Sequence, residues 1–183
     1  MRCLLFFLAF SATLQETARA EPPRQIEAFA TVGVSRLAGD EGSEGNGASF
    51  GGAVTIPFAA RWAVDMQALT TGANNYANYN VRYTFLSPAI QYRRGDENAY
   101  WFIAGGPGLA AERTSGSYQL QEPGGTLTVS FERSDNKLTL HWRTGAVFRP
   151  TGRLLIRGEF FWVSRYVLPT VGAAVSVGYR FGR

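Results

Sequence analysis

The chain has 183 residues, 21 of them glycine, with 14% aromatic residues, one histidine, one cysteine and a formal net charge of +4 at pH 7. The length suits a single domain. The arginines are scattered and form no run, which argues against a nucleic-acid-binding surface, and one His with one Cys argues against a transition-metal site. No metal and no cofactor are predicted.

The first residues resemble an export signal. Met1-Arg2 is a short basic start, residues 3–10 are almost entirely apolar, and Ala18-Arg19-Ala20 has the small-x-small pattern of a cleavage site. The apolar run is too short for a spanning helix, which needs about 20 residues. We therefore expect a cleavable signal peptide over residues 1–20 and a mature domain over residues 21–183. The one cysteine leaves with the signal peptide, so no disulfide is expected.

The mature part shows period-two alternation of apolar and polar residues, which is typical of β-strands. In the last predicted strand, Val175, Val177 and Tyr179 share one face, while Ser176 and Arg180 lie on the other. Similar patterns predict eight strands, over residues 26–35, 50–58, 62–69, 81–86, 100–111, 138–148, 153–162 and 171–181. In the fourth of these, Val81, Tyr83 and Phe85 are assigned to the apolar outward face, and Arg82, Thr84 and Leu86 to the inward face.

The distribution of charge favours a membrane as the solvent for the apolar faces. One face of nearly every predicted strand is uncharged over about nine to eleven residues, the span of a tilted membrane strand. Aromatic residues such as Trp62, Phe148 and Tyr179 lie toward strand ends, as in the aromatic girdles of outer-membrane barrels. We therefore predict an all-β fold, a closed antiparallel up-and-down transmembrane β-barrel, in the bacterial outer membrane.

The connections alternate in length, as expected for such a barrel. Those after even-numbered strands are short, and those after odd-numbered strands are mostly longer, above all residues 112–136. This places both chain ends in the periplasm. Pro88 and residues 105–108 interrupt strands and predict a bulge or a bend. Residues 126–137 resemble half of a hairpin, which either extends the sixth strand above the membrane or adds a strand pair. We expect eight strands, with ten as the alternative.

Three segments carry a family resemblance: residues 104–109, residues 156–159 and the closing residues 175–181. Through them and the export signal, the mature chain resembles the outer-membrane barrels of the OmpA, OmpX and opacity types, here without a peptidoglycan-binding domain. The resemblance implies recognition of the last strand by the barrel assembly machinery. Family members usually end on the aromatic residue itself, whereas Gly182-Arg183 follow Phe181 here.

The inward faces collect polar and charged residues, and an eight-stranded barrel is only wide enough for side chains. We expect a lumen network of ion pairs formed by Glu27, Asp65, Arg82, His141, Arg143, Arg157, Glu159 and Arg180, with Gln67 beside them. A narrow pore is the alternative. Arg157 and Glu159 lie two residues apart, so cross-strand partners for Glu159, such as Arg143 or Arg180, are favoured over a direct pair.

His141 is the one residue on which His-dependent catalysis could rest. Barrel enzymes of the lipid A deacylase and phospholipase kinds resemble one another in pairing His with Ser, but no Ser lies two residues after His141. Ser130 or Ser164 could approach it from a neighbouring strand. A lipid-modifying enzyme therefore stays an alternative, and a non-enzymatic barrel is expected.

The segment of residues 74–80 is rich in Asn and Tyr, a composition that suits adaptable contacts. It supplies a candidate surface-contact loop, formed by Asn74, Asn75, Tyr76, Asn78 and Tyr79. The expected function is thus structural or surface-interacting, by adhesion or partner binding. Expected partners are outer-membrane lipid and lipopolysaccharide, the barrel assembly machinery and an extracellular partner bound through the loops.

Overall fold

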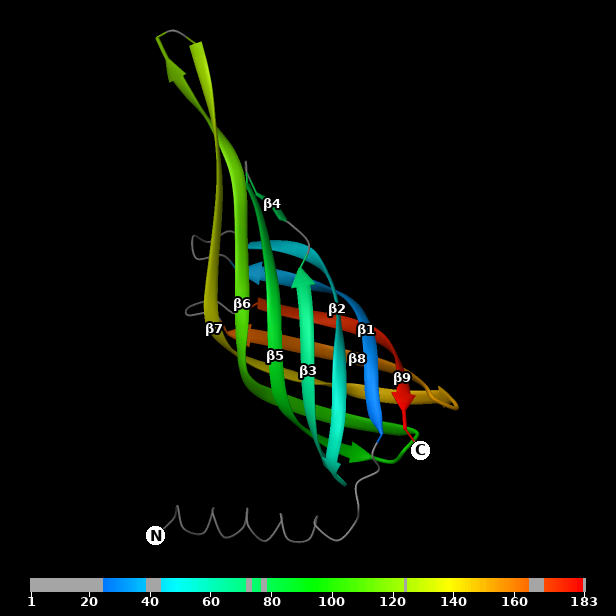
Figure 1. Ribbon diagram of the computed structural model, residues 1–183. Coiled ribbons are helices and arrows are strands. Elements are labelled where there is room, and N and C mark those ends of the chain that lie inside the picture. The colour runs from blue at the N-terminus through cyan, green and yellow to red at the C-terminus, as the bar shows by residue number, and fades with distance from the viewer. Residues whose placement is uncertain are drawn as a thin grey trace, which may run out of the picture.

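The computed structural model describes residues 25–38, 44–71, 74–76, 79–123, 125–164 and 170–182. These residues form strands and the turns between them (Figure 1). The strands are β1 (Ile26–Ala38), β2 (Glu44–Ala59), β3 (Trp62–Thr71), β4 (Asn74–Tyr76), β5 (Tyr79–Gly95), β6 (Ala99–Glu122), β7 (Gly125–Thr151), β8 (Leu154–Ser164) and β9 (Thr170–Phe181). Within these ranges no helix is long and apolar enough to cross a membrane. The predicted signal peptide lies outside the described residues.

The strands close into an antiparallel ring. Consecutive strands pair from β1 to β3 and from β5 to β9, β3 pairs with β5, and β1 pairs with β9 from Ile26↔Phe181 to Arg36↔Val171. The three-residue β4 pairs only with the start of β5, so it adds no strand to the ring. The predicted eight-stranded up-and-down barrel is confirmed.

The short connections gather at one end of the ring. They consist of residues 60–61, 96–98 and 152–153. The first residue of β1 and the last of β9 pair at the same end, which lies at the lower right in Figure 1. The opposite end carries the β6–β7 hairpin. The short connections lie where they were predicted, whereas the predicted longest connection, residues 112–136, consists of paired strand up to Glu122 and from Gly125 onward.

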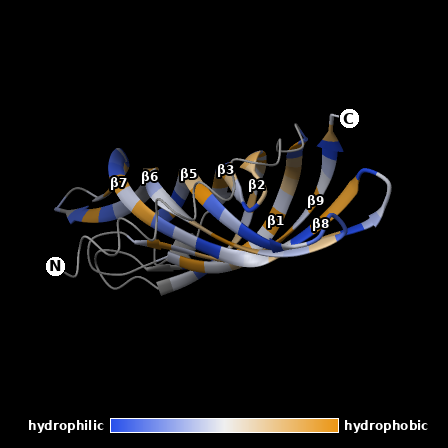
Figure 2. Cartoon of the chain, turned by 90° about the horizontal axis from the view of Figure 1, so that it is seen from below, coloured by the Kyte–Doolittle hydropathy of each residue, from blue (hydrophilic) through white to orange (hydrophobic). Residues whose placement is uncertain are grey.

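The two faces of the ring differ in polarity. Along β9, Val175, Val177 and Tyr179 are exposed on the outside, while Ser176 and Arg180 are buried inside. Figure 2 shows the resulting alternation of hydrophobic and hydrophilic segments along the strands. On the outward faces, the eight strands of the ring carry no charged residue across a belt bounded by Arg36, Arg82, Arg94 and Arg113.

The predicted facing of β5 is wrong. Tyr83 and Phe85 are buried in the interior, where each is only 2% exposed, and Arg82, Thr84 and Leu86 are exposed on the outside. The interior of a small barrel must be filled by side chains, and two stacked aromatic rings fill it here, with centroids 5.9 Å apart. The assignment failed because apolar residues occur on both faces of this strand.

No bulge forms at Pro88 or at residues 105–108. The β5–β6 pairing pauses between Leu86↔Leu109 and Ile90↔Gly105 but resumes in the same register, and the β6–β7 pairing is continuous. A Cβ atom at Gly106 would lie only 2.5 Å from the Pro88 carbonyl oxygen. Glycine therefore lets the two backbones approach where Pro88 cannot donate to the ladder. The bend of β6 is visible in Figure 1.

The β6–β7 hairpin continues far beyond the ring. Its pairing runs without a break from Ala99↔Phe148 to Glu122↔Gly125, whereas β5 leaves β6 at Gly116 and β8 leaves β7 at Leu140. Residues 126–137 are therefore the extension of β7, and the ten-stranded alternative is wrong. The hairpin projects past the other strands in Figure 1.

Candidate functional site

The interior charges come from five strands of the ring. The structure places seven of the predicted residues on the inward faces, all buried: Glu27 on β1, Asp65 on β3, His141 and Arg143 on β7, Arg157 and Glu159 on β8, and Arg180 on β9. The period-two geometry of each strand points these side chains to the lumen, while their sequence neighbours face outward. They fall into two groups along the barrel.

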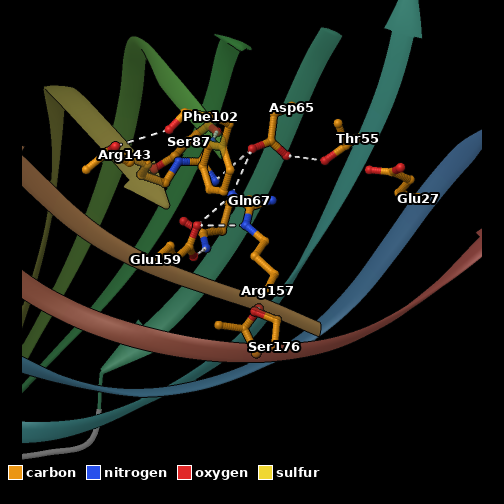
Figure 3. A network of polar contacts seen from close by, with 12 residues as sticks. Glu27, Thr55, Asp65, Gln67, Ser87, Phe102, Arg143, Arg157, Glu159 and Ser176 are labelled. Carbon is orange, nitrogen blue, oxygen red and sulfur yellow. Dashed lines mark hydrogen bonds and ion pairs between the residues drawn. The ribbon is translucent and has the colours of Figure 1, made fainter. Parts of the chain in front are cut away.

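The central group is built around Arg157 and Asp65 (Figure 3). Arg157 contacts Glu159 Oε2 through Nε at 2.9 Å and Nη2 at 2.5 Å, and its Nη2 lies 3.1 Å from Asp65 Oδ2. Arg143 Nη1 lies 3.3 Å from the same Asp65 oxygen. Thr55 donates to Asp65 Oδ1 at 2.9 Å, and Gln67 donates to Glu159. Two arginines and two carboxylates thus balance in one buried cluster.

Aromatic rings cover the Arg157 guanidinium. Its Cζ atom lies 4.3 Å from the Phe102 ring centroid and 5.3 Å from that of Phe29. An aromatic face attracts a cation, and the attraction is stronger where water is excluded. Arg157 is therefore held by two carboxylates and by two rings at once, which fixes its position across the lumen.

The second group lies toward the end with the short turns. Arg180 Nη2 contacts Glu27 Oε1 at 2.8 Å, and the Tyr100 hydroxyl donates to Glu27 Oε2 at 2.5 Å. The pair is again neutral overall. Together the two groups pair the buried carboxylates of Glu27, Asp65 and Glu159 with arginines, which is the arrangement that offsets the desolvation of buried charges. Arg143 Nε, Arg157 Nη1 and Arg180 Nε have no hydrogen-bond partner among the described residues.

Three predictions about this network are wrong; two are described here, and the third, which concerns His141, is described below. Arg82 lies on the outward face of β5, exposed, because the facing of that strand is opposite to the predicted one. Arg157 and Glu159 form a direct pair. Cross-strand partners were predicted instead, because side chains two residues apart on a strand point in parallel. The lumen is narrow enough for the long Arg157 side chain to fold back toward Glu159 while still reaching Asp65 on the opposite wall.

Sequence reasoning missed Thr55 and Tyr100 as members of the network. Thr55 lies on the inward face of β2, and Tyr100, the second residue of β6, also faces the interior. The alternation of side chains along each strand predicts that both residues face inward. Neither residue is charged, so neither was included among the predicted ion-pair residues.

His141 is buried in the lumen at 1% exposure, and neither ring nitrogen has a hydrogen-bond partner among the described residues. It therefore takes part in no ion pair there, contrary to prediction, and neither Ser130 nor Ser164 hydrogen-bonds to it. In the same part of the chain, no group of three His, Cys, Asp or Glu side chains is arranged to hold a metal ion.

The projecting hairpin reverses the polarity of the ring. On the outward face of β7, Leu138 is 79% exposed. From Asn136 back to Thr126, toward the tip of the hairpin, the residues on that face are polar. The face continuous with the lumen becomes apolar instead, and it consists of Tyr118, Leu120, Leu127, Val129 and Phe131. The rings of Tyr118 and Phe131 lie 6.4 Å apart. The reversal marks the level at which the hairpin leaves the apolar surroundings of the belt.

Asn74, Asn75 and Tyr76 form β4, and Tyr79 opens β5, beside the base of the hairpin. Asn78 and the side chains of this segment lie outside the described residues. The predicted contact loop thus stays a prediction, located at the same end as the hairpin.

Taken together, the ring, the uncharged outer belt and the filled lumen define the fold class of the small eight-stranded outer-membrane barrels of the OmpA and OmpX type. Compared with family models and with curated proteins, the sequence finds no match.

Solved structures show the same fold at low sequence identity. Ail, the attachment invasion locus protein of Yersinia pestis, has a TM-score of 0.61 at 16% identity, covering 87% of this chain and 99% of that chain. The outer membrane protein OprG of Pseudomonas aeruginosa has a TM-score of 0.57 at 12% identity, covering 90% and 99%. Neisserial surface protein A has a TM-score of 0.56 at 11% identity, covering 87% and 96%.

Proposed function

We propose that this chain is an exported, non-enzymatic outer-membrane barrel that presents the β6–β7 hairpin for surface interaction. The uncharged belt supports the membrane location. On β5 it extends from Thr84 to Tyr92, between Arg82 and Arg94, a length that fits a tilted membrane strand of about nine to eleven residues. Lipid and lipopolysaccharide would contact this belt, and the assembly machinery would recognise β9.

The observation that carries the surface role is the amphipathic hairpin. Past the belt, five apolar side chains lie on one face of a two-stranded ribbon, and Tyr118, Leu127 and Phe131 are 40% to 50% exposed. An exposed, contiguous apolar surface rimmed by polar residues is typical of a protein contact site. The hairpin end also carries the Asn- and Tyr-rich segment, so both candidate contact elements lie at one end.

Fractionation tests the membrane location. We expect the protein to be recovered only with detergent and to migrate faster on a denaturing gel before heating than after it, because a closed strand ring resists detergent. Recovery in the aqueous fraction would contradict the proposal in favour of a soluble periplasmic barrel.

Matched variants of the two hairpin faces test the surface role. The apolar-face variant combines Tyr118→Ser, Leu120→Ser and Phe131→Ser, and the polar-face control combines Ser117→Ala, Gln119→Ala and Ser130→Ala. Bacteria producing each protein are scored for adherence to an epithelial monolayer. We expect the apolar-face variant to lose the adherence that the wild type confers and the control to keep it. Equal adherence of all three would exclude contact through this face.

The buried position of His141, without a hydrogen-bonded hydroxyl in the described part of the chain, supports the non-enzymatic role. A His141→Ala variant is expected to leave the lipid A and phospholipid species of the producing cell unchanged in mass spectrometry. A changed lipid profile would instead support the lipid-modifying alternative.

A further inference from the structure

The end of the barrel with the short turns contains a cavity of about 450 Å³. Four arginines line it: Arg61 in the β2–β3 turn, Arg93 and Arg94 at the end of β5, and Arg180 on β9. These strands lie apart in the sequence, and ring closure brings their ends to one mouth. The cavity is thus a concentration of positive charge at the level where the barrel ends.

The carboxylates of the cavity wall are already engaged. Glu27 holds Arg180 and Tyr100, as described above. Asp96 accepts the backbone amides of Asn98 and Ala99 at 2.7 and 2.9 Å. Glu97 is paired with Arg149, 3.7 Å away and outside the wall. None of the three neutralises the remaining arginines of the cavity.

Arg61, Arg93 and Arg94 have no carboxylate within ion-pair distance in the described ranges. Arg93 lies over the Tyr100 ring, with Cζ 5.5 Å from the centroid. The Nε atom of Arg180, a residue only 6% exposed, is buried at the cavity wall without a hydrogen-bond partner. Guanidinium groups with free donors around one concavity are complementary to a phosphate or carboxylate oxygen cluster.

The position of the cavity favours a lipid as the source of that anion. Arg94 follows Tyr92 on the outward face of β5. Tyr92 packs edge-on between Trp62 and Trp101, with centroids 5.2 and 5.9 Å away. Such aromatic groups lie at the level of lipid headgroups. The cavity therefore lies at the level of the phosphates of the adjacent leaflet, and Arg94 is its lining arginine on the outward face.

We propose that this cavity binds the phosphate of an anionic phospholipid headgroup from the periplasmic leaflet. The inference rests on the proposed membrane location. It assigns a binding role to the end of the barrel opposite the hairpin. The lumen offers no such site for an anion, because the charged side chains described there are already paired. Bound lipid would tie the β2–β3 and β5–β6 turns together through Arg61 and Arg93, whose backbones are already joined by a hydrogen bond from Arg93 N to Arg61 O at 2.9 Å.

The test uses the purified, detergent-solubilised protein with equimolar phosphatidylglycerol and phosphatidylcholine of identical acyl chains, scored by native mass spectrometry. We expect the wild type to retain more phosphatidylglycerol. Arg93→Gln should lower the ratio of the two adducts roughly fivefold, the effect of about one membrane-proximal charge. The matched control is Arg153→Gln, which removes one charge from an exposed turn at the same end, outside the cavity, and should leave the ratio unchanged.

Equal ratios for Arg93→Gln and Arg153→Gln would overturn the assignment, since only general charge would then matter. Displacement of phosphatidylglycerol by an equal concentration of inorganic phosphate would overturn the lipid source in favour of free phosphate. Heat-modifiable migration of each variant shows that the barrel is intact. An intact wild-type barrel without lipid preference refutes this inference alone, whereas a protein that stays in the aqueous fraction refutes the proposed function.

Discussion

Asp65 is the carboxylate on which two buried arginines converge. Its Oδ2 atom is the shared contact of Arg143 and Arg157, and all three side chains are at most 1% exposed. Removal of one partner from a buried ion pair leaves an uncompensated charge in a low-dielectric interior, and this costs more than the pair itself contributes. The lumen is therefore most sensitive at this residue.

The variant Asp65→Asn is expected to lower the free energy of unfolding by about 3 to 5 kcal/mol. The control is Glu132→Gln, which breaks the exposed pair with Arg113 on the hairpin and should cost no more than about 1 kcal/mol. Urea unfolding of both variants in lipid vesicles compares them. Similar costs for the two would show that burial of the central cluster has little energetic effect.

Asp96 offers a pH-dependent prediction outside the membrane-spanning segments. The backbone amides of Ala99 and Asn98 donate to its carboxylate and hold its pKa below the ordinary value of 3.8. A depressed pKa contributes stability that is fully present above the unfolded pKa and is lost as the pH falls through the folded pKa. Asp96→Asn should therefore be less stable than the wild type at pH 7. The difference should shrink only once the pH falls below 3.8, as measured by paired urea titrations. A difference that is constant with pH would contradict the assignment.

At the residue scale, the sequence predicts which charges face inward better than it predicts their partners. Asp65 and Arg143 follow from alternation alone. The direct Arg157–Glu159 pair and the role of Tyr100 do not, because they depend on how far long side chains reach across a closed lumen. That distance is set by ring closure, which local pattern does not contain.

At the scale of the strand, the proposed membrane location predicts two environments for the outward faces, lipid for the belt and water for the hairpin. Val175 lies near the middle of β9 and is 55% exposed on the belt, while Ser130 is exposed on the polar face of the hairpin. Val175→Arg should lower the free energy of unfolding of the barrel in vesicles by about 2 to 4 kcal/mol. Ser130→Arg should change it by no more than about 0.5 kcal/mol. Equal effects would place both residues in the same solvent.

Strand β5 shows why alternation is insufficient when both faces carry apolar residues. Tyr83 and Phe85 fill the lumen, while Thr84 and Leu86 face outward. Arg82 and Arg94 lie on the same face of β5, at the two ends of an uncharged stretch of that face. When they are taken as the limits of the belt, the face that carries Thr84 and Leu86 is correctly assigned as outward. The extension of β7 was predictable from the same rule, since polar residues replace apolar ones on its outward face beyond Leu138.

At the scale of the molecule, the filled lumen predicts that the barrel does not conduct ions. We expect no single-channel steps for the wild type in a planar bilayer. The double variant Arg157→Ala with Glu159→Ala removes both members of a pair and should produce small steps, because it opens space without leaving either partner unpaired. Steps in the wild type would support the narrow-pore alternative.

Period-two alternation, uncharged outward faces and the positions of the short connections made the barrel predictable from sequence, and the fold confirms it. The mouth cavity was not predictable, because Arg61, Arg93 and Arg180 look unrelated until ring closure brings the ends of β2, β5 and β9 to the same end of the barrel.

The pairing of β1 with β9 also governs the order of assembly. Glu27 pairs with Arg180, which lies 153 residues later in the chain, so the ring cannot close until its last strand has been synthesised. Contacts of such long sequence separation form slowly. The chain must therefore remain open, with its apolar strand faces uncovered, until that strand is available to pair.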